Sequence, residues 1–414
     1  MNEHSHILIK LLSAAISGKS PDFLTSCPDW DFIYEEAKAH QVHTLLFPLL
    51  EELPKQLKPS PSLLESWKCD ALREAALQLL HIEQMEKVLL CLHEDSIPVI
   101  ALKGLLLRSY YPYPELRTMG DADLLIHKED FKKAHRVLTS LGYKKGKSAE
   151  RHTTYSLTGY PDIELHEILT DNREIENLNH FTFQVWKNAV PGLLGHAPIL
   201  CLSIKDQLMH QLFHIIHHVL LSGVGIRQLC DLTLFATYHS EEIIWENILY
   251  ELEPYGYDKF TLVLLSICRE FLGLSVSEEV LAEEDAEFHA NRALLTEDIM
   301  NSGVYGKRTK EREASRHILL HVRNEGSTPG MAAKPSSPKI SVLLNYFRFL
   351  FPTPGKLNRQ YRYARKFPVL LPLAWIHRAF YNIRQLSLLS FVSNKETTAA
   401  YARRAALLSW LKLR

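Results

Sequence analysis

The stretch Ile97-Pro-Val-Ile-Ala-Leu-Lys-Gly104, followed by Leu116-Arg-Thr-Met-Gly-Asp121-Ala-Asp123-Leu-Leu-Ile126, decides the fold of this chain. Two short apolar runs flank a helical piece, and the second run begins with two carboxylates two residues apart. Because side chains alternate along a strand, Asp121 and Asp123 project from one face of it, while Ala122 and Leu124 point into a core. A divalent cation is the simplest explanation of such a pair, and Mg²⁺ prefers one or two carboxylates plus substrate phosphates. Taken alone, an acidic pair at a strand start is more often a solvated edge or a helix cap.

The composition is that of a globular protein with two or three domains. The chain has 414 residues, of which 46% are hydrophobic and 23% charged. Its six cysteines contain no Cys-x-x-Cys pair, which argues against a disulfide framework or a zinc site and favours a reducing cytoplasm. The segment His6–Ile16 is broken by Lys10 and resembles an amphipathic helix more than a signal peptide. Because no apolar run approaches the roughly 20 residues of a membrane span, we expect a cytoplasmic protein.

The charge is distributed unevenly. Residues 339–414 contain 14 Lys and Arg against one acidic residue, whereas residues 1–338 hold 33 basic and 47 acidic residues. This basic tail either docks on the acidic body or binds an anionic surface, such as lipid at the inner face of the membrane. We leave both options open. Nucleic acid is not an expected partner, because no recognised module or continuous basic groove is apparent.

The order of patterns predicts an α+β protein, a small mixed β-sheet embedded in mostly helical N- and C-terminal regions. We expect helices at Ile7–Ile16, Trp30–Leu50 and Ser62–Leu92, and then a β-α-β-α-β-β unit. Its strands are Ile97–Leu102, Asp121–Ile126, Thr153–Leu157 and Asp162–Ile168, and its helices are Leu105–Tyr111 and Lys128–Leu141. The predicted divisions are 1–96 (helical), 97–195 (α/β core), 196–323 (helical, lining the cleft), 324–338 (linker or mobile loop) and 339–414 (basic helical tail).

The last predicted strand carries a third carboxylate. In Asp162-Ile-Glu164-Leu-His166 the apolar residues face one way, and Asp162, Glu164 and His166 face the other. If this strand lies beside Asp121–Ile126, Glu164 completes a three-carboxylate cluster that could hold two metal ions. His166 could bind substrate, orient Glu164 or be an ordinary hydrogen-bonded histidine.

These elements, in this order, resemble the nucleotidyltransferase superfamily of the DNA polymerase β type. More closely, Leu102-Lys-Gly104, Arg117-Thr-Met-Gly-Asp121-Ala-Asp123, a helix ending Leu141-Gly-Tyr143, and Glu164-Leu-His166 resemble a bacterial group called nucleotidyltransferase family proteins. The resemblance covers about residues 90–235. It departs from the wider superfamily in that Leu105 follows Gly104 where Gly-Ser or Gly-Gly is usual, and 16 residues separate Gly104 from Asp121.

The resemblance implies an enzyme that transfers a nucleoside monophosphate from an NTP, such as ATP, to a hydroxyl of a small molecule, sugar or peptide. Two Mg²⁺ ions held by Asp121, Asp123 and Glu164 would serve an in-line displacement. The nucleotide-binding candidates are Lys103, Gly104, Arg117 and Gly120, and the two cationic ones could equally be surface residues. The alternative is a nucleotide-binding regulatory or interaction protein that keeps the fold without turnover. Intact carboxylates count against it, and the residues around Gly104 count for it.

A histidine-bearing helix follows the core and begins near Ser203. His210, His214 and His217 share one face of it, which could make a metal site, although ordinary packing is the more frequent explanation. Its position in the resembled group makes His214 a candidate substrate contact, with Arg227 and Asp231 further along the chain. Those two could instead form an internal salt bridge one helical turn apart.

Overall fold

The computed structural model describes residues 3–148, 152–169, 178–221, 223–281, 285–303, 351, 361–381 and 395–413. The chain divides into two compact units, one of residues Met1–Ile216 with Val224–Val304, the other of His217–Gly223 with Tyr305–Arg414. The first unit holds the α+β core that the sequence predicted. The proposed five-part division of the chain remains a prediction.

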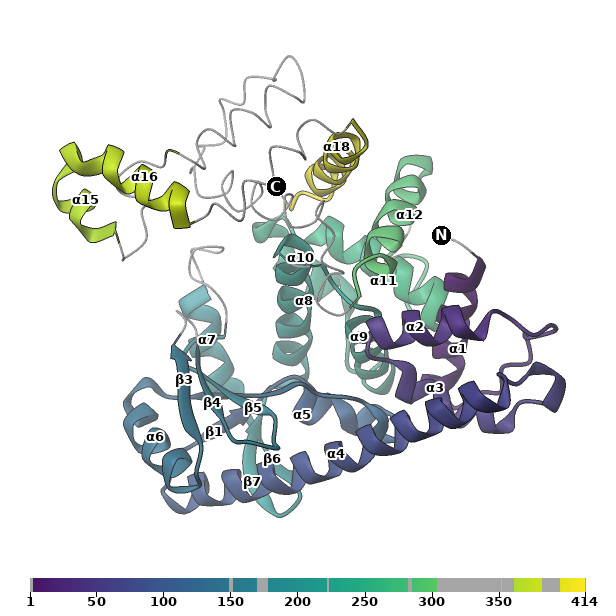
Figure 1. Ribbon diagram of the computed structural model, residues 1–414, viewed down its shortest axis with the longest axis horizontal. Helices are drawn as coiled ribbons and strands as arrows, with labels where there is room; N and C mark the ends of the chain where they lie inside the picture. Colours follow the sequence, from purple (N-terminus) through teal and green to yellow (C-terminus); the bar gives the residue numbers. More distant parts are fainter. Residues whose placement is uncertain are drawn as a thin grey trace. The chain divides into compact units, whose positions relative to one another are not determined.

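The first unit contains a mixed sheet (Figure 1), with strand order β3-β4-β5-β2-β1-β7-β6. Its strands are β1 (Val99–Ala101), β2 (Asp121–Ile126), β3 (Lys144–Ser148), β4 (His152–Ser156), β5 (Asp162–His166), β6 (Val190–Leu194) and β7 (Ala197–Cys201). The pairs β2·β5 and β1·β7 are parallel, and the other neighbouring pairs are antiparallel. Strand β2 therefore lies between β1 and β5, in the middle of the sheet.

The helices of the first unit precede, interrupt and follow the sheet. They are α1 (Glu3–Ser17), α2 (Trp30–Ala39), α3 (His43–Glu52), α4 (Pro61–Glu94), α5 (Gly104–Leu107), α6 (Phe131–Ser140), α7 (Leu178–Asn188), α8 (Ile204–Leu221, to Ile216 in this unit), α9 (Ile226–Tyr238), α10 (Trp245–Leu252), α11 (Asp258–Leu272) and α12 (Ala286–Met300). Single 3₁₀ turns continue α5 at Arg108–Tyr110 and precede β2 at Pro114–Leu116.

The two faces of the sheet are covered by different helices. Ala122, Leu124 and Ile126 alternate along β2 and pack with α4 and α6 in one buried core, and Figure 1 shows α4 running along the sheet. Residues Met85, Val88, Leu89 and Leu92 of α4 recur at helical spacing, so one stripe of that helix faces this core. On the opposite face, Leu125 of β2 packs with Val185 of α7. The acidic residues of β2 belong to this second face.

The prediction of one helix over Trp30–Leu50 is wrong, because this range forms two helices, α2 and α3. Gln41 has a positive φ of 54°, and the amide of Val42 donates to the carbonyl of Ala37 (2.9 Å), which closes α2. A left-handed residue cannot continue an α-helix, so the chain turns before α3. The apolar spacing continues through the turn, since both helices bury their apolar residues against the same region.

Three strands carry no signal that we recognised in the sequence. Strand β3, Lys-Lys-Gly-Lys-Ser, has no apolar residue and lies at the edge of the sheet. Strands β6 and β7 contain Pro191 and Pro198, which lower the expectation of a strand. The hairpin extends the sheet to Cys201, beyond residue 195, where our predicted core ends.

The second unit contains α15 (Arg362–Lys366), α16 (Leu371–Tyr381) and α18 (Lys395–Trp410). Tyr361, Ala364 and Ala374 form a small buried cluster, and Arg404 of α18 donates to the carbonyl of Val219 (2.6 Å). Among the described residues, no helix is long and apolar enough to cross a membrane. The predicted linker 324–338 lies outside the described residues, as do residues 339–350, 352–360, 382–394 and 414 of the tail.

Candidate active site

The candidate site lies at one end of the central strands, where β1 ends and β2 and β5 begin. Strands β1 and β2 are antiparallel, so Lys103, just after β1, lies near the start of β2. Strands β2 and β5 are parallel, and Asp123 stands directly opposite Glu164 in their register. Asp121 and Asp123 share a face, because only Ala122 lies between them and side chains alternate along a strand. The strand register therefore places the three predicted metal ligands on one face of two neighbouring strands, and their role as ligands stays a prediction.

Asp123 is the most enclosed carboxylate of the three and has two donors. Its side chain is 3% exposed, and its Oδ1 lies 2.8 Å from the Nζ of Lys103 and 2.8 Å from the Nε2 of His166. Burial raises the pKa of Asp123, but the lysine charge and the histidine hydrogen bond outweigh burial and hold the pKa well below its usual range. Asp123 is therefore ionised at neutral pH.

The neighbouring groups respond to the same charges. Burial lowers the pKa of Lys103, but the carboxylates of Asp123, Asp121 and Glu164 raise it above its ordinary value. Burial also lowers the pKa of His166, whereas its hydrogen bonds to Asp123 and Glu164 raise it by more. For Asp121, burial and the negative charge of Asp123 raise the pKa to about 6. The pair of aspartates thus holds one strongly acidic and one weakly acidic carboxyl.

Glu164 lies between two histidines, one of which our sequence reasoning missed. The Nε2 of His152, on β4, lies 3.2 Å from Oε1 of Glu164, and the Nε2 of His166 lies 3.6 Å from its Oε2. His152 pairs directly with His166 across β4 and β5. The predicted strand began at Thr153, one residue too late, and only the pairing of β4 with β5 places His152 beside Glu164.

Lys103 and Gly104 form the turn from β1 into α5. Lys103 has φ 48° and ψ −123°, a backbone conformation that suits glycine, so the lysine is held there at some cost in strain. Gly104 has no such φ. A Cβ at Gly104 would lie 2.7 Å from Nη1 of Arg117 and 3.1 Å from Sδ of Met119. Close packing by these two side chains accounts for the glycine.

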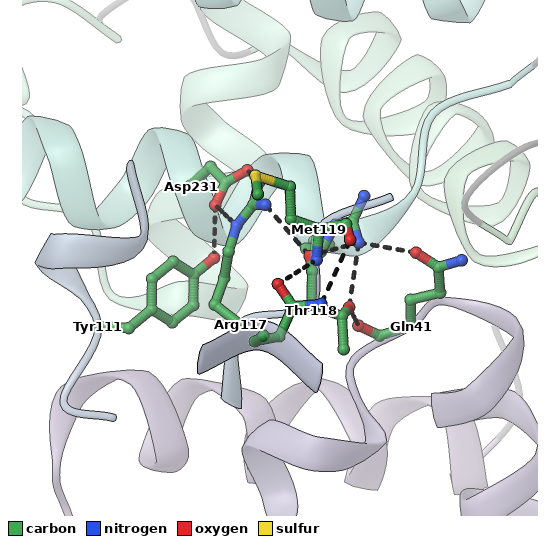
Figure 2. Close-up of polar contacts among 8 residues, drawn as sticks. Gln41, Tyr111, Arg117, Thr118, Met119 and Asp231 are labelled. Carbon is green, nitrogen blue, oxygen red and sulfur yellow. Dashed lines mark hydrogen bonds and ion pairs between the residues drawn. The ribbon is translucent and has the colours of Figure 1, made fainter. Parts of the chain in front are cut away.

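Arg117 and Asp231, both predicted to contact substrate, are partners of each other in the structure. Both residues are 5% exposed, and two guanidinium nitrogens of Arg117 donate to the two carboxylate oxygens of Asp231. Tyr111 donates its hydroxyl to the same carboxylate (2.7 Å), as Figure 2 shows. A buried, bidentate ion pair of this kind occupies the groups that would otherwise bind a phosphate. A salt bridge between Arg227 and Asp231 was one of the two alternatives for these residues, and the structure pairs Asp231 with Arg117 instead.

Arg227 lies beside the segment that enters β2. Its Nη1 donates to Oε1 of Gln41 (2.7 Å) and to the carbonyl of Thr118 (2.9 Å). Met119 is held on its other side by Gln78, whose amide exchanges two hydrogen bonds with the Met119 backbone (3.1 and 3.2 Å). Gly120 follows as an exposed residue directly before Asp121. The approach to the aspartates is therefore fixed by side chains from several helices.

The histidines of α8 do not assemble a metal site within the described residues. The one group there with three mutually close His, Cys, Asp or Glu ligand atoms is His152, Glu164 and His166. The rings of His210 and His214 lie 6.3 Å apart. Burial, followed by the charge of Lys103, lowers the pKa of His210 to about 3, so this ring is neutral. Neither of its nitrogens has a hydrogen-bond partner among the described residues.

Comparison of the sequence with known protein families finds a match. The sequence pattern of a family described as "Uncharacterised nucleotidyltransferase" matches residues 26–273, more than half of the chain. The chain belongs to this family. The match spans the whole sheet, the aspartates of β2, Glu164, and helices α2 to α11.

Curated proteins and solved structures add little detail to this family assignment. No curated protein matches the chain. Among solved structures, the chain is similar to the antibiotic-resistance factor ANT(2'')-Ia in solution, with 12% sequence identity and a TM-score of 0.33 over 43% of this chain and 94% of that one. The expected family and fold class are thus confirmed, as a nucleotidyltransferase with an α+β core.

Proposed function

We propose that this nucleotidyltransferase moves a nucleoside monophosphate from an NTP to a hydroxyl group of a small molecule, sugar or peptide. The observation that carries the proposal is the register of β2 with β5, which sets Asp123 opposite Glu164 with Asp121 on the same face. Three carboxylates gathered at one end of these strands suit an in-line displacement at phosphorus that uses divalent cations.

The donor set fits Mg²⁺. Asp121, Asp123 and Glu164 supply the oxygen ligands that this ion prefers, and substrate phosphates complete its coordination in related chemistry. Asp121 and Asp123 would hold both ions, and Glu164 the one nearer the acceptor. When bound, the metal neutralises charge on the transferred phosphoryl group and lowers the pKa of the acceptor hydroxyl.

The protein's own side chains prepare this site for an anionic substrate. Lys103 carries a positive charge at the same end of the strands as the carboxylates, and its ion pair with Asp123 fixes the aspartate's orientation. His166 holds the same oxygen from the other side. We propose that Lys103 also contributes charge toward the triphosphate, whereas Arg117 supports the site from within the core.

The proposal is tested by labelling. Purified protein is incubated with Mg²⁺, each of the four α-labelled NTPs and cell extract, and a labelled acceptor or released pyrophosphate is measured. Asp121→Asn and Asp123→Asn should lower the signal by at least about 10²-fold, because each removes a charge that the transition state requires. Asp162→Asn is the matched control, since Asp162 is the exposed partner of Asp121 in the sheet register.

The alternative is a nucleotide-binding regulatory protein without turnover. It is favoured by the residues around Gly104, where Leu105 follows the glycine and the side chains of Arg117 and Met119 pack against it. Saturable NTP binding with no labelled product under any condition would support the alternative. Equal product from wild type and Asp123→Asn would disprove the metal assignment.

A further inference from the structure

His152 and His166, on either side of Glu164, offer imidazole ligands that the carboxylate mechanism does not use as metal ligands. His152 and Glu164 are 24% and 22% exposed at their side chains, while His166 is 9% exposed. The three side chains come from adjacent antiparallel strands and share one face, because His152 pairs with His166 and Thr154 with Glu164. Solvent therefore reaches a carboxylate that lies between two imidazoles.

The distances within this group are close to those of a coordinated metal. In a tetrahedral site with bonds of about 2.0–2.2 Å, ligand atoms lie about 3.3 Å apart. The Nε2 of His152 lies 3.2 Å from Oε1 of Glu164, the Nε2 of His166 lies 3.6 Å from its Oε2, and one ligand atom from each of the three residues lies within 4.8 Å of the other two. Small rotations of two imidazoles would bring them to coordination distance.

The types of donor indicate the class of metal. Two imidazoles and one carboxylate are the ligands of Zn²⁺ sites with an open position, and they also suit Mn²⁺, Fe²⁺ and Co²⁺. Mg²⁺ prefers oxygen ligands and gains little from imidazole. We propose that His152, Glu164 and His166 form a binding site for a divalent transition-metal ion.

This site adjoins the carboxylate pair. Oδ1 of Asp123 lies 2.8 Å from Nε2 of His166, within reach of an ion on that imidazole. Asp123 therefore borders this site, although it is not one of the three residues whose ligand atoms lie within 4.8 Å of one another. Glu164 would then hold the transition metal in place of the Mg²⁺ nearer the acceptor, and Asp121 and Asp123 would hold the other ion. Binding itself does not require nucleotidyl transfer, so the two proposals can fail separately.

The test measures metal binding by full-length protein that carries no polyhistidine tag and has been stripped with a chelator. Co²⁺ is the probe, because its visible absorption reports imidazole and carboxylate ligation, and Zn²⁺ is added in competition. We expect one Co²⁺ per chain in this site, displaced by Zn²⁺ and retained in excess Mg²⁺. His152→Gln should weaken Co²⁺ binding by at least about tenfold, and His152→Cys, which restores a ligand, should recover Zn²⁺ binding.

Two controls separate this site from other metal-binding groups. His196 makes a comparable contact with Glu86 (2.8 Å), but its side chain is 94% exposed, and His196→Gln should leave the affinity unchanged. Asp121→Asn should retain Co²⁺ binding while losing transfer. Thermal melting of the metal-free variants checks that each is folded. Equal Co²⁺ affinity in wild type and His152→Gln, or preferential binding of Mg²⁺ by the wild type, would overturn the proposal.

Discussion

Lys103 and Gly104 are adjacent residues under different constraints. The backbone is constrained at Lys103, and the space beside the Cα is constrained at Gly104. Lys103 adopts a backbone conformation suited to glycine and keeps a side chain that reaches Asp123 (2.8 Å). Gly104 has ordinary backbone angles and no room for a side chain. The ion pair offsets the strain at Lys103, and the packing of Arg117 and Met119 accounts for the glycine.

We predict that Gly104→Ala lowers the free energy of unfolding by about 1–3 kcal/mol, because the added methyl overlaps Arg117, which Asp231 holds in place. Urea denaturation measures this loss. The matched comparison is Gly18→Ala, where φ is +63° but a Cβ meets nothing within 4 Å. If Gly104→Ala lowered the free energy of unfolding by less than Gly18→Ala, Arg117 would be able to move aside at little cost, which would contradict the prediction.

The segment from Arg117 to Gly120 is the structural link between the helical layers and the site. Three regions hold it, namely the backbone carbonyl of Gln41 between α2 and α3, the side chain of Gln78 of α4, and the side chains of Arg227 and Asp231 of α9. Asp121 follows this segment directly. Helices remote in sequence therefore fix where β2 begins, and with it the position of both aspartates.

We predict that Asp231→Leu destabilises the first unit by about 3–5 kcal/mol, because it leaves the buried guanidinium of Arg117 without a counter-charge. The double variant that adds Arg117→Met should lose less stability than the two single variants together. The difference should exceed about 1 kcal/mol. A double-mutant cycle in urea measures this coupling.

The control for this cycle is an exposed ion pair of the same unit. Lys205 and Glu251 are 55% and 39% exposed, and Glu251→Leu should change the stability by less than about 1 kcal/mol. Strict additivity of the Arg117 and Asp231 variants would contradict the structural role of the buried pair.

At the scale of the whole molecule, buried neutral histidines link stability to pH. Burial lowers the pKa of His43 to about 4, and its side chain lies in the helical layer beside Tyr34. Between the ordinary pKa of 6.5 and about 4, the unfolded chain binds a proton that the folded chain does not. Stability contributed by this group is therefore present above pH 6.5 and lost as pH falls.

We predict that the free energy of unfolding falls by about 3 kcal/mol between pH 7 and pH 4, because the unfolded chain protonates His43 and the folded chain does not. His43→Leu should flatten the pH dependence of the free energy of unfolding by that amount, because it removes the titrating ring. His93→Gln, at an exposed position on α4, serves as the control. An unchanged slope in His43→Leu would contradict the prediction.

The tail is the part of the molecule about which the structure adds least. Its excess of basic residues is a property of the sequence, whereas the structure tests neither internal docking nor binding to an anionic membrane surface. Both remain predictions. Liposome flotation with anionic lipid at low and high salt distinguishes them, since only membrane binding gives salt-sensitive flotation.

The sequence by itself determined the α+β class, the exact range of β2, and the face on which Asp121, Asp123, Glu164 and His166 lie. It could do so because strand alternation is a local property that the pattern of apolar and polar residues records. The family followed from the same residues. Strands without that pattern, such as β3 and the hairpin of β6 and β7, could not be found in this way.

Only the tertiary structure decided the partners of the charged residues. That Arg117 pairs with Asp231, Lys103 with Asp123, and His152 with Glu164 depends on strand order and helix packing that join segments tens of residues apart. A charge in a sequence carries no information about which opposite charge lies within 3 Å of it, because Coulomb attraction acts through space and the fold sets the distances.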